Sequence, residues 1–493
     1  MKLLFCCCEY WPSVGGVQEV MRQIAERMVA KGHDVTVATS SHRNRNSKVI
    51  NGVKVREFKA GGRLAYGLNG QIDEYREFVR TFEVDAILIM AAQQWSFDAL
   101  WPILDDIKAR KVFIPCGFSG LFEPNFAQYF RELPDVLRKF DHLVFNAEKY
   151  RDIDFVRDIG LSKFTVLPNG ISETDFEREA DDEFRQKLAI PDDAFLFLTV
   201  GNPIEAKGHR EVIDAFSRLD TGGQPAVLLS IAGWPVGGSA SSGHLRLAAH
   251  MSYRLREIAQ LEGVRGLAQL VRRKVVNSRF GAAVRDVGAA IHRLLYIVRV
   301  EGWDGIKQLA RRKVTRYKAR RRVPPLESIE SMAKKASAQP FKRVILTDLE
   351  RADLVQAYLA ADLFVFASQI EYSPLVLFEA AAAGTPFLTV PVGNADEIVR
   401  WTGGGVLCEA IKDDRGYTRV DPGALASEMV RCMRDREGLN RFGATARERW
   451  RNYFTWKIVA GYYEDILAGR PPDVRIPEIK DMVPDERAIP SVA

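Results

Sequence analysis

The stretch Glu371-Tyr-Ser-Pro-Leu-Val-Leu-Phe-Glu379-Ala-Ala-Ala-Ala-Gly384-Thr-Pro386 places two carboxylates eight positions apart around a short helix. Ser373 suits an N-cap, and Pro374 suits the first helical position. Gly384 suits the left-handed position that follows the last turn, and the proline two positions later prevents the helix from continuing. Local chemistry therefore predicts both ends of this helix.

The backbone amides near Leu375 and Val376 would lie unpaired at the positive end of the helix dipole. Such a helix terminus attracts an anion, and carboxylates on either side of it can accept hydrogen bonds from hydroxyl groups. Glu371 and Glu379 occupy these flanking positions. The pattern favours a phosphate with sugars at both ends, and the alternative is a capped surface helix with two solvated glutamates.

The chain has 493 residues, which is too long for one hydrophobic core and predicts two or three domains. No apolar run is long enough for a membrane-spanning helix, and the first twelve residues predict a strand rather than a secretion signal. The six cysteines show no metal-like pair spacing, so they are interpreted as small core residues. We expect a cytoplasmic protein without a metal site.

Short apolar strands alternate with amphipathic helices, which predicts an α/β protein with two parallel sheets in two Rossmann-like domains. The first series of expected strands covers 2–8, 34–40, 85–91, 111–116, 142–146 and 164–168. The second covers 194–201, 226–233, 343–347, 362–368 and 386–390. An acidic connector at 173–183 separates the two series.

The first helix is expected to begin at Gly15-Gly16 and to end at Lys31-Gly-His33. A dinucleotide fingerprint would place G-x-G-x-x-G directly after the first strand. Residues 8–16 contain no such loop, which argues against a nicotinamide-dependent dehydrogenase. In the second series, Lys207 lies at a strand-to-helix junction, where its ammonium could neutralise a diphosphate leaving group.

Several motifs together resemble the family 4 retaining glycosyltransferases, which have the GT-B fold. They are the E-x7-E stretch, Gly15-Gly-Val-Gln18, the Lys207-Gly208 pair, and three further segments at 166–171, 392–399 and 454–460. The resemblance covers residues 1–234 and 340–467. It implies an N-terminal acceptor-side domain at 1–175, a C-terminal donor-binding domain at 185–455, and a helix with a tail at 456–493 that crosses back.

The resemblance also implies roles for individual residues in binding a UDP- or GDP-hexose, with no further cofactor. Glu371 would lie against the donor sugar and Glu379 against the ribose hydroxyls. Lys207 would contact the diphosphate together with the amides of Leu375 and Val376, next to Ser373. Gly16 would belong to the loop that faces the donor.

The chain departs from the family pattern at two positions. Asn202 stands where the family usually has an arginine that contacts the diphosphate. The loss of this cation could weaken donor binding. Alternatively, Asn202 could form a hydrogen bond with the phosphate while another basic side chain supplies the positive charge. Cys116 stands where many relatives have a histidine near the sugar. Since a buried thiol is a poor base, we expect the loop with Gly117 and Ser119 to shape the sugar and acceptor site.

A basic insertion at 240–335 has no counterpart in the family pattern. Residues 245–322 hold 20 Lys or Arg against 5 Asp or Glu, and the sequence at 262–275 recurs 39 residues later at 301–314. The segment therefore carries a net charge of +15, while the whole chain carries +6. A basic helical hairpin could bind an anionic membrane, another protein or a second copy, or, as the least favoured hypothesis, nucleic acid.

These patterns predict a hexosyltransferase that acts with retention in polysaccharide or lipid-linked glycan synthesis, at the inner face of a membrane if the insertion binds lipid. Two alternatives stay open. One is a GT-B scaffold that binds a nucleotide sugar without turnover, and the other is a GT-B epimerase or phosphorylase.

Overall fold

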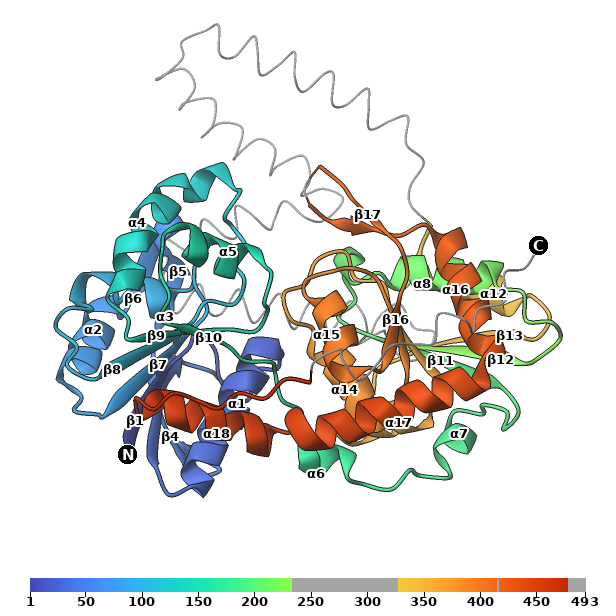
Figure 1. Ribbon diagram of the computed structural model, residues 1–493, viewed down its shortest axis with the longest axis horizontal. Helices are drawn as coiled ribbons and strands as arrows, with labels where there is room; N and C mark the ends of the chain where they lie inside the picture. Colours follow the sequence, from blue (N-terminus) through green and yellow to red (C-terminus); the bar gives the residue numbers. More distant parts are fainter. Residues whose placement is uncertain (233–326, 415, 478–493) are drawn as a thin grey trace, which may run out of the picture. The chain divides into compact units, whose positions relative to one another are not determined.

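The computed structural model describes residues 1–232, 327–414 and 416–477 (Figure 1). Of the predicted insertion at 240–335, residues 240–326 lie outside the described part of the chain. Within the described part, two separate sheets carry the fold, and both are parallel apart from one short edge pairing between β3 and β4. This arrangement confirms the predicted α/β architecture with two Rossmann-like domains.

The N-terminal sheet has eight strands in the order β10-β9-β8-β7-β1-β2-β4-β3. Its strands are β1 (Lys2–Cys6), β2 (Asp34–Ser40), β3 (Val49–Ile50), β4 (Val53–Phe58), β7 (Ala86–Met90), β8 (Arg110–Ile114), β9 (His142–Phe145) and β10 (Phe164–Val166). The sequence predicted six of these strands. It missed β3 and β4, together with the small hairpin of β5 (Ala60–Arg63) and β6 (Gly67–Gly70), because short glycine-containing or half-exposed strands lack a continuous apolar run.

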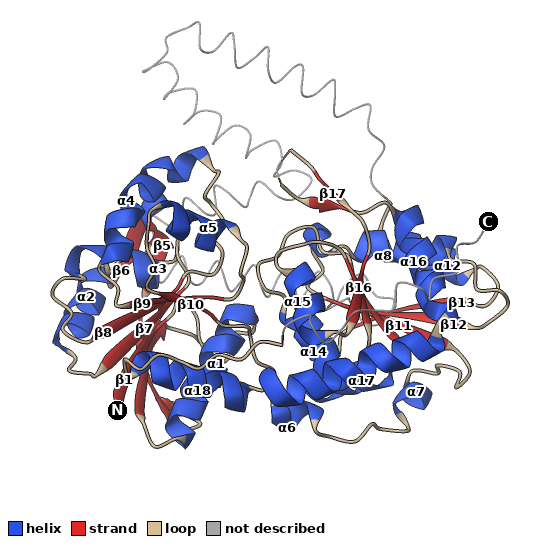
Figure 2. Ribbon diagram, viewed as in Figure 1, coloured by secondary structure: helices blue, strands red, loops and turns tan. Residues whose placement is uncertain are grey.

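Helices cover both faces of the N-terminal sheet (Figure 2). Along β1, Leu4 and Cys6 pack into one core, while Leu3, Phe5 and Cys7 pack into the other, since successive side chains of a strand point to opposite faces. The helices are α1 (Gly16–Ala30), α2 (Ile72–Thr81), α3 (Trp95–Asp98), α4 (Ala127–Arg138) and α5 (Arg151–Asp158), with short 3₁₀ turns η1 (Leu64–Tyr66), η2 (Trp101–Ile103) and η3 (Pro124–Phe126).

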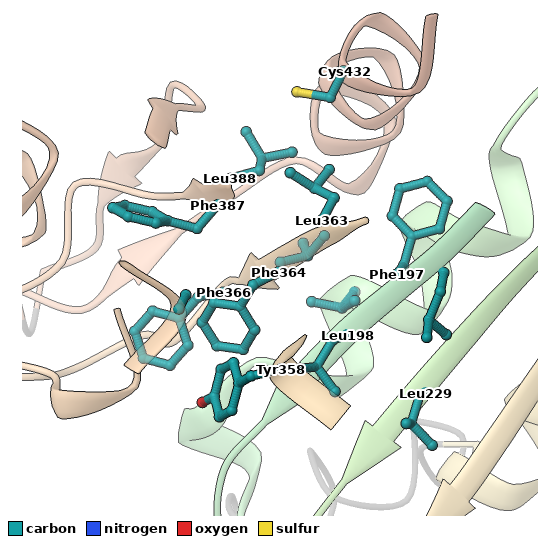
Figure 3. Packing of buried hydrophobic residues seen from close by; sticks show 14 of the residues in the cluster. Phe197, Leu198, Leu229, Tyr358, Leu363, Phe364, Phe366, Phe387, Leu388 and Cys432 are labelled. Atoms are coloured by element: carbon teal, nitrogen blue, oxygen red, sulfur yellow. The ribbon is translucent and has the colours of Figure 1, made fainter. Parts of the chain in front are cut away.

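The C-terminal sheet has six strands in the order β13-β12-β11-β14-β15-β16. They are β11 (Phe195–Val200), β12 (Ala226–Ile231), β13 (Lys342–Thr347), β14 (Leu363–Phe366), β15 (Phe387–Thr389) and β16 (Gly405–Leu407). Their side chains belong to one buried cluster, in which Tyr358 packs against Phe364 with ring centroids 5.4 Å apart (Figure 3). The sequence predicted all of these strands except β16, and it also missed the hairpin of β17 (Ile411–Lys412) and β18 (Thr418–Arg419).

The described residues of the second half contain the helices α8 (His209–Arg218), α12 (Ile329–Ser337), α13 (Arg351–Ala360), α14 (Leu375–Ala383), α15 (Ala395–Thr402), α16 (Pro422–Arg434) and α17 (Arg436–Tyr453), with the turn η4 (Glu205–Lys207) before α8. Two short helices, α6 (Glu173–Phe176) and α7 (Phe184–Lys187), lie in the connector. The last described helix, α18 (Trp456–Leu467), packs into the N-terminal core beside α1.

Candidate functional site

Lys207 and Glu371 are separated by 164 residues and meet directly in the structure. The Lys207 Nζ lies 2.5 Å from Glu371 Oε1, and the Ser368 hydroxyl donates to the same oxygen at 2.8 Å. Both charged side chains keep partial access to solvent, with exposed fractions of 24% and 13%. The pair therefore combines a cation and a carboxylate that a ligand could reach.

The turn before α8 is docked on the segment that follows β14, which explains how Lys207 reaches Glu371. Gly208 has a left-handed φ of 75°, and a Cβ added there would lie 2.0 Å from the Ala367 carbonyl oxygen. Gln369 N donates to the Ala206 carbonyl at 2.8 Å. Only glycine permits this backbone contact.

The helix of the E-x7-E stretch begins one residue later than the sequence predicts. Pro374 is the N-cap and has extended backbone angles, while the Ser373 side chain caps no amide. The Ser373 hydroxyl instead accepts a hydrogen bond from Asn169 Nδ2 at 3.1 Å, so the predicted serine cap is wrong. Gly384 does adopt the predicted left-handed conformation, with φ 74°.

Leu375 and Val376 are the first residues of α14, so the helix itself offers no acceptor for their N–H groups. Gly16, from the Gly-Gly loop, lies against this end of the helix: a Cβ added at Gly16 would meet Leu375 Cδ1 at 3.9 Å. Leu375 also packs against hydrophobic cores of both sheets. The structure thus brings the predicted loop glycine next to the side chain of Leu375, the first residue of α14.

Glu379 is buried and forms an ion pair with Arg351, the first residue of α13. Arg351 also contacts Asp175 Oδ2 through Nη2, at 3.0 Å. Burial alone would lower the pKa of the Arg351 guanidinium, but the two carboxylates outweigh it and raise the pKa. The sequence did not predict Arg351, because its distance of 28 residues from Glu379 carries no local signal.

Asn202, the departure from the family pattern, lies exposed in the turn that follows β11. Its carbonyl accepts a hydrogen bond from Ile204 N at 2.8 Å, which shapes the turn. The neighbouring Gly201 lies against Lys207, since a Cβ added there would meet Lys207 Cβ at 3.3 Å. Asn202 is therefore on the same turn as Lys207.

The loop after β8 has three consecutive residues in the left-handed region: Cys116 (φ 60°), Gly117 (φ 94°) and Phe118 (φ 42°). Such conformations persist only where surrounding contacts hold them. Gly117 N donates to Asp152 Oδ2 at 2.8 Å, and Gly120 N donates to Gln93 Oε1 at 3.1 Å. The buried side chains of Asp152 and Gln93, which carry no sequence signal, therefore maintain this loop.

Ser119 also belongs to this loop, and its hydroxyl donates to Gln93 Oε1 at 3.3 Å. Burial raises the pKa of the Cys116 thiol to about 12, and the negative charge of Asp152 adds to the effect. A thiol with such a pKa stays protonated near neutral pH. That Cys116 does not act as a base stays a prediction.

Asp152 is fully buried and links the loop after β8 to the E-x7-E stretch. Burial raises its pKa to about 6, although hydrogen bonds from the Tyr372 hydroxyl and the Gly117 amide oppose the increase. Tyr150, two residues earlier, donates its hydroxyl proton to the Glu371 carbonyl at 2.7 Å. The backbone around Glu371 is thus held partly by residues of the first half of the chain.

Glu397 forms another long-range contact of this kind. Its two carboxylate oxygens accept hydrogen bonds from the backbone amides of Glu148 and Lys149, each at 2.8 Å. Nearby, Asn394 Nδ2 donates to the Asn146 carbonyl at 2.7 Å. Burial raises the pKa of Glu397 to about 7, despite the two amide donors. The sequence placed Glu397 in a family-like turn but did not predict its partners.

Among the described residues, no cluster of three or more His, Cys, Asp or Glu side chains could hold a metal ion. No helix in the same part of the chain is both long and apolar enough to cross a membrane.

Comparisons with known proteins agree with this architecture. Residues 14–175 match the family model "Glycosyltransferase Family 4", and residues 326–449 match "Glycosyl transferases group 1". Among solved structures, sucrose-phosphate synthase from Thermosynechococcus elongatus superposes with a TM-score of 0.58 at 16% identity, covering 95% of this chain and 99% of that one. The Anabaena protein HepE, solved with UDP and glucose, gives 0.57 at 16% identity and covers 95% and 100%.

These likenesses in structure and the two parallel sheets define the class of fold, GT-B. Each half is therefore similar to the glycosyltransferases of the model that it matches, family 4 in residues 14–175 and group 1 in residues 326–449.

Curated relatives match over shorter regions. A glycogen synthase from Mycobacterium tuberculosis is 31% identical over 142 residues, which is 28% of this chain and 32% of that protein. The GDP-mannose:cellobiosyl-diphosphopolyprenol alpha-mannosyltransferase of Komagataeibacter xylinus is 25% identical over 200 residues, 36% of this chain and 47% of that protein. The matched regions span less than half of either relative.

Proposed function

We propose that this protein transfers a hexosyl group from a UDP- or GDP-sugar to an acceptor hydroxyl with retention of configuration. The observation that carries the proposal is the Lys207–Glu371 pair, which lies beside the first turn of α14. A flexible cation, free helix amides and a reachable carboxylate are the groups that a nucleotide diphosphate sugar requires. The names of the relatives above, which include UDP-bound and GDP-mannose-using proteins, support the donor class.

In this proposal each residue has a separate task. Lys207 and the amides of Leu375 and Val376 bind the diphosphate, Glu371 accepts hydrogen bonds from the donor sugar, and Glu379 accepts them from the ribose. Ser373 orients the start of α14 through Asn169, and Gly16 leaves room for the diphosphate beside Leu375.

The reaction breaks the bond between the sugar C1 and the diphosphate oxygen and forms a bond between C1 and the acceptor oxygen. The acceptor proton passes to the departing diphosphate, so UDP or GDP leaves with that proton. Lys207 stabilises the charge that grows on the leaving group, and its release from Glu371 frees this carboxylate for the sugar hydroxyls. The loop with Cys116, Gly117 and Ser119 shapes the acceptor side without supplying a base.

Arg351 supplies the cation nearest to the proposed ribose carboxylate, since it pairs with Glu379. A nucleotide that binds Glu379 must share or displace this guanidinium. Once displaced, Arg351 offers a positive charge to the nucleotide, which would offset the absence of an arginine at Asn202. In this proposal the rearrangement compensates for one of the two departures from the family pattern, Asn202.

The test is nucleotide release from a panel of UDP- and GDP-sugars, with thermal unfolding measured alongside, for the wild type, Glu371→Ala and Lys207→Ala. Release from one donor that both variants lose would support the transferase. Saturating donor should raise the melting temperature, because a ligand at 100 times its Kd stabilises by about 2.7 kcal/mol. If the donor binds but no nucleotide is released, even with membrane extract as acceptor, the protein is not a transferase and the scaffold is favoured. If the product is an altered sugar nucleotide, the epimerase is favoured.

The acceptor is proposed to be a polysaccharide or a lipid-linked glycan, reached at an anionic membrane through the basic segment 245–322. The support is the charge of that segment, 20 cations against 5 carboxylates, since each Lys or Arg near such a surface adds about 1 kcal/mol. Partitioning onto anionic liposomes should be strong for the full chain and weak for a variant that lacks 245–322. Equal partitioning of the two proteins would exclude this role.

A further inference from the structure

Glu371 lies in a stretch without regular secondary structure, residues 367–374 between β14 and α14. Carbonyl groups in such a stretch need hydrogen-bond partners that neither a helix nor a sheet supplies. The Glu371 carbonyl accepts from the Tyr150 hydroxyl at 2.7 Å, and the Tyr372 carbonyl accepts from Asn394 N at 2.9 Å. Groups from outside the stretch therefore hold two consecutive carbonyls of its main chain, one of them that of Glu371.

Tyr372 also holds this main chain through its side chain. Its hydroxyl accepts a hydrogen bond from Asn146 N at 2.9 Å and donates one to Asp152. The rings of Tyr150 and Tyr372 lie 5.0 Å apart, and a Cβ added at Gly117 would lie 3.1 Å from each of them. The two tyrosines thus pack together between the loop after β8 and the main chain of the E-x7-E stretch.

The part of the chain that carries Tyr150 is itself held by its main chain. The carboxylate of Glu397 accepts hydrogen bonds from the amides of Glu148 and Lys149, each at 2.8 Å. These two bonds lie within two residues of Tyr150, so they limit how far its hydroxyl can shift. Tyr150 is therefore a firm anchor for the Glu371 carbonyl.

The main chain of Glu371 matters because its side chain must change partners in the proposed function. In the free protein the carboxylate bonds to Lys207 and to the Ser368 hydroxyl. When Lys207 moves to the diphosphate, the carboxylate loses one of these two partners. Its position then depends more strongly on the main chain that carries it, and a misplacement of about 1 Å is enough to weaken its contacts with a ligand.

We propose that Tyr150 and Tyr372 are positioning residues that hold Glu371 where its carboxylate meets the donor sugar. The inference rests on the proposed function, since it concerns how Glu371 binds that sugar. Neither tyrosine hydroxyl contacts the donor, because both are bonded to groups of the protein. Their loss should therefore weaken the binding of the sugar part of the donor and spare the nucleotide part.

Calorimetry on the full chain tests this for the wild type, Tyr150→Phe and Tyr372→Phe. The Kd of the UDP- or GDP-sugar that the wild type binds most tightly is compared with the Kd of UDP or GDP alone. We expect each variant to raise the Kd of the nucleotide sugar about threefold to tenfold, the loss expected for one neutral hydrogen bond. The Kd of the free nucleotide should stay unchanged.

Tyr462→Phe is the matched control, because the Tyr462 hydroxyl also accepts a hydrogen bond from a main-chain amide, that of Arg475, at 3.3 Å. Tyr462 lies in α18 and has no part in the proposed donor site. This variant should bind the nucleotide sugar and the free nucleotide as the wild type does. If Tyr372→Phe does not fold, Tyr150→Phe alone carries the test.

A double-mutant cycle shows whether the tyrosines act through Glu371. In the Glu371→Ala background, neither Tyr150→Phe nor Tyr372→Phe should raise the Kd of the nucleotide sugar further. Equal rises in both backgrounds would overturn the proposal, because the tyrosines would then act without Glu371. Equal weakening of the nucleotide sugar and the free nucleotide would also overturn it, because the loss would then be a general loss of structure.

The same measurements separate the failure of this inference from the failure of the proposed function. If the wild type binds neither a nucleotide sugar nor a free nucleotide, the proposed function fails, and the positioning role fails with it. If the wild type binds the nucleotide sugar and both tyrosine variants bind it equally well, the proposed function stands and only the positioning role is wrong.

Discussion

At the scale of single residues, the candidate site depends on charges that neutralise one another before any ligand arrives. Lys207 and Glu371 pair at 2.5 Å, and Arg351 pairs with both Glu379 and Asp175. Such pairs keep half-buried charges compensated in the free protein. In the proposed function a donor must therefore exchange partners with the protein, so each side chain can be tested separately.

Lys207→Ala should lower kcat/KM for the nucleotide sugar by about 10²–10³, the loss typical of removing one group that stabilises transition-state charge. The effect should appear in kcat rather than only in KM, because the charge on the leaving group grows as the bond breaks. Lys187→Ala is the matched control, since that lysine pairs with Asp181 at the surface, at 2.6 Å. Equal kinetics for Lys207→Ala and Lys187→Ala would remove Lys207 from the mechanism.

Glu397 predicts a pH dependence of stability. Its pKa is raised from the ordinary 4.5 to about 7 by burial, so the folded protein holds this proton more tightly than the unfolded chain. Its contribution to the free energy of unfolding should therefore fall as the pH rises from about 4.5 to 7, and should stay constant above that window.

Urea unfolding of the wild type and Glu397→Gln across this pH range measures the effect. The difference in stability, wild type minus variant, should decrease with rising pH, because glutamine does not titrate. The same substitution at the exposed Glu437 is the control. A difference that grows with pH would contradict the burial-raised pKa.

At the scale of elements, the position of Lys207 depends on how tightly η4 and the start of α8 dock on the end of β14. Gly208 is in the left-handed region and in contact with the Ala367 carbonyl, where a Cβ would lie at 2.0 Å. Gly160 has a nearly identical φ of 74°, but nothing lies within 4 Å of an added Cβ. Substituting both glycines therefore distinguishes the effect of backbone strain, which both positions share, from the effect of the docking contact, which only Gly208 makes.

In both alanine variants the free energy of unfolding should fall by about 1–2 kcal/mol, because alanine is strained in the left-handed region. Gly208→Ala should lose more stability than Gly160→Ala, because the added methyl group pushes η4 away from the end of β14. The same shift displaces Lys207, so Gly208→Ala should also lower kcat/KM. Gly160→Ala should keep the kinetics of the wild type. Chemical unfolding and donor turnover are measured for the two variants. If Gly208→Ala and Gly160→Ala lose the same stability and the same activity, the contact between Gly208 and the Ala367 carbonyl does not position Lys207.

At the scale of the whole molecule, the two halves are joined by side chains that cross between them. The described chain returns to the N-terminal core through α18, where Trp456 and Tyr463 are buried. A parallel bridge pairs Ile171 of the connector with Thr455, just before α18. Gly170 lies against Trp456 so closely that an added Cβ would come within 2.8 Å of the indole. The connector and the last helix thus cross at one packed point.

Trp456→Ala should lower the free energy of unfolding by about 3–5 kcal/mol, because it leaves a cavity in the N-terminal core where the connector and α18 cross. Thermal unfolding should show a lower melting temperature, and the N-terminal half should become sensitive to proteolysis first. Lys457→Ala, at the exposed neighbouring position, should leave the melting temperature unchanged. A small loss for Trp456→Ala would mean that α18 contributes little to the stability of the core.

Much of the fold follows from the sequence, because its signals are local. Continuous apolar runs predicted eleven of the strands now seen in the two sheets, and the spacing in α1 predicted a helix from Gly16 to its end near Lys31. At α14, Gly384 marked the C-terminal end correctly. The serine cap failed since Asn169, distant in the chain, engages the Ser373 hydroxyl.

The sequence by itself determined the two α/β halves, the helix of the E-x7-E stretch and the types of side chain that we propose bind a nucleotide sugar. Only the tertiary structure decided which of them meet: Lys207 with Glu371, Arg351 with Glu379, and Asp152 with Gly117. The physical reason is that β11 and β14 are neighbours in the sheet although more than 150 residues separate them, so the loops at their ends adjoin. Helix caps and strand periodicity act over a few residues, whereas these pairs depend on strand order and on how segments from both halves pack together.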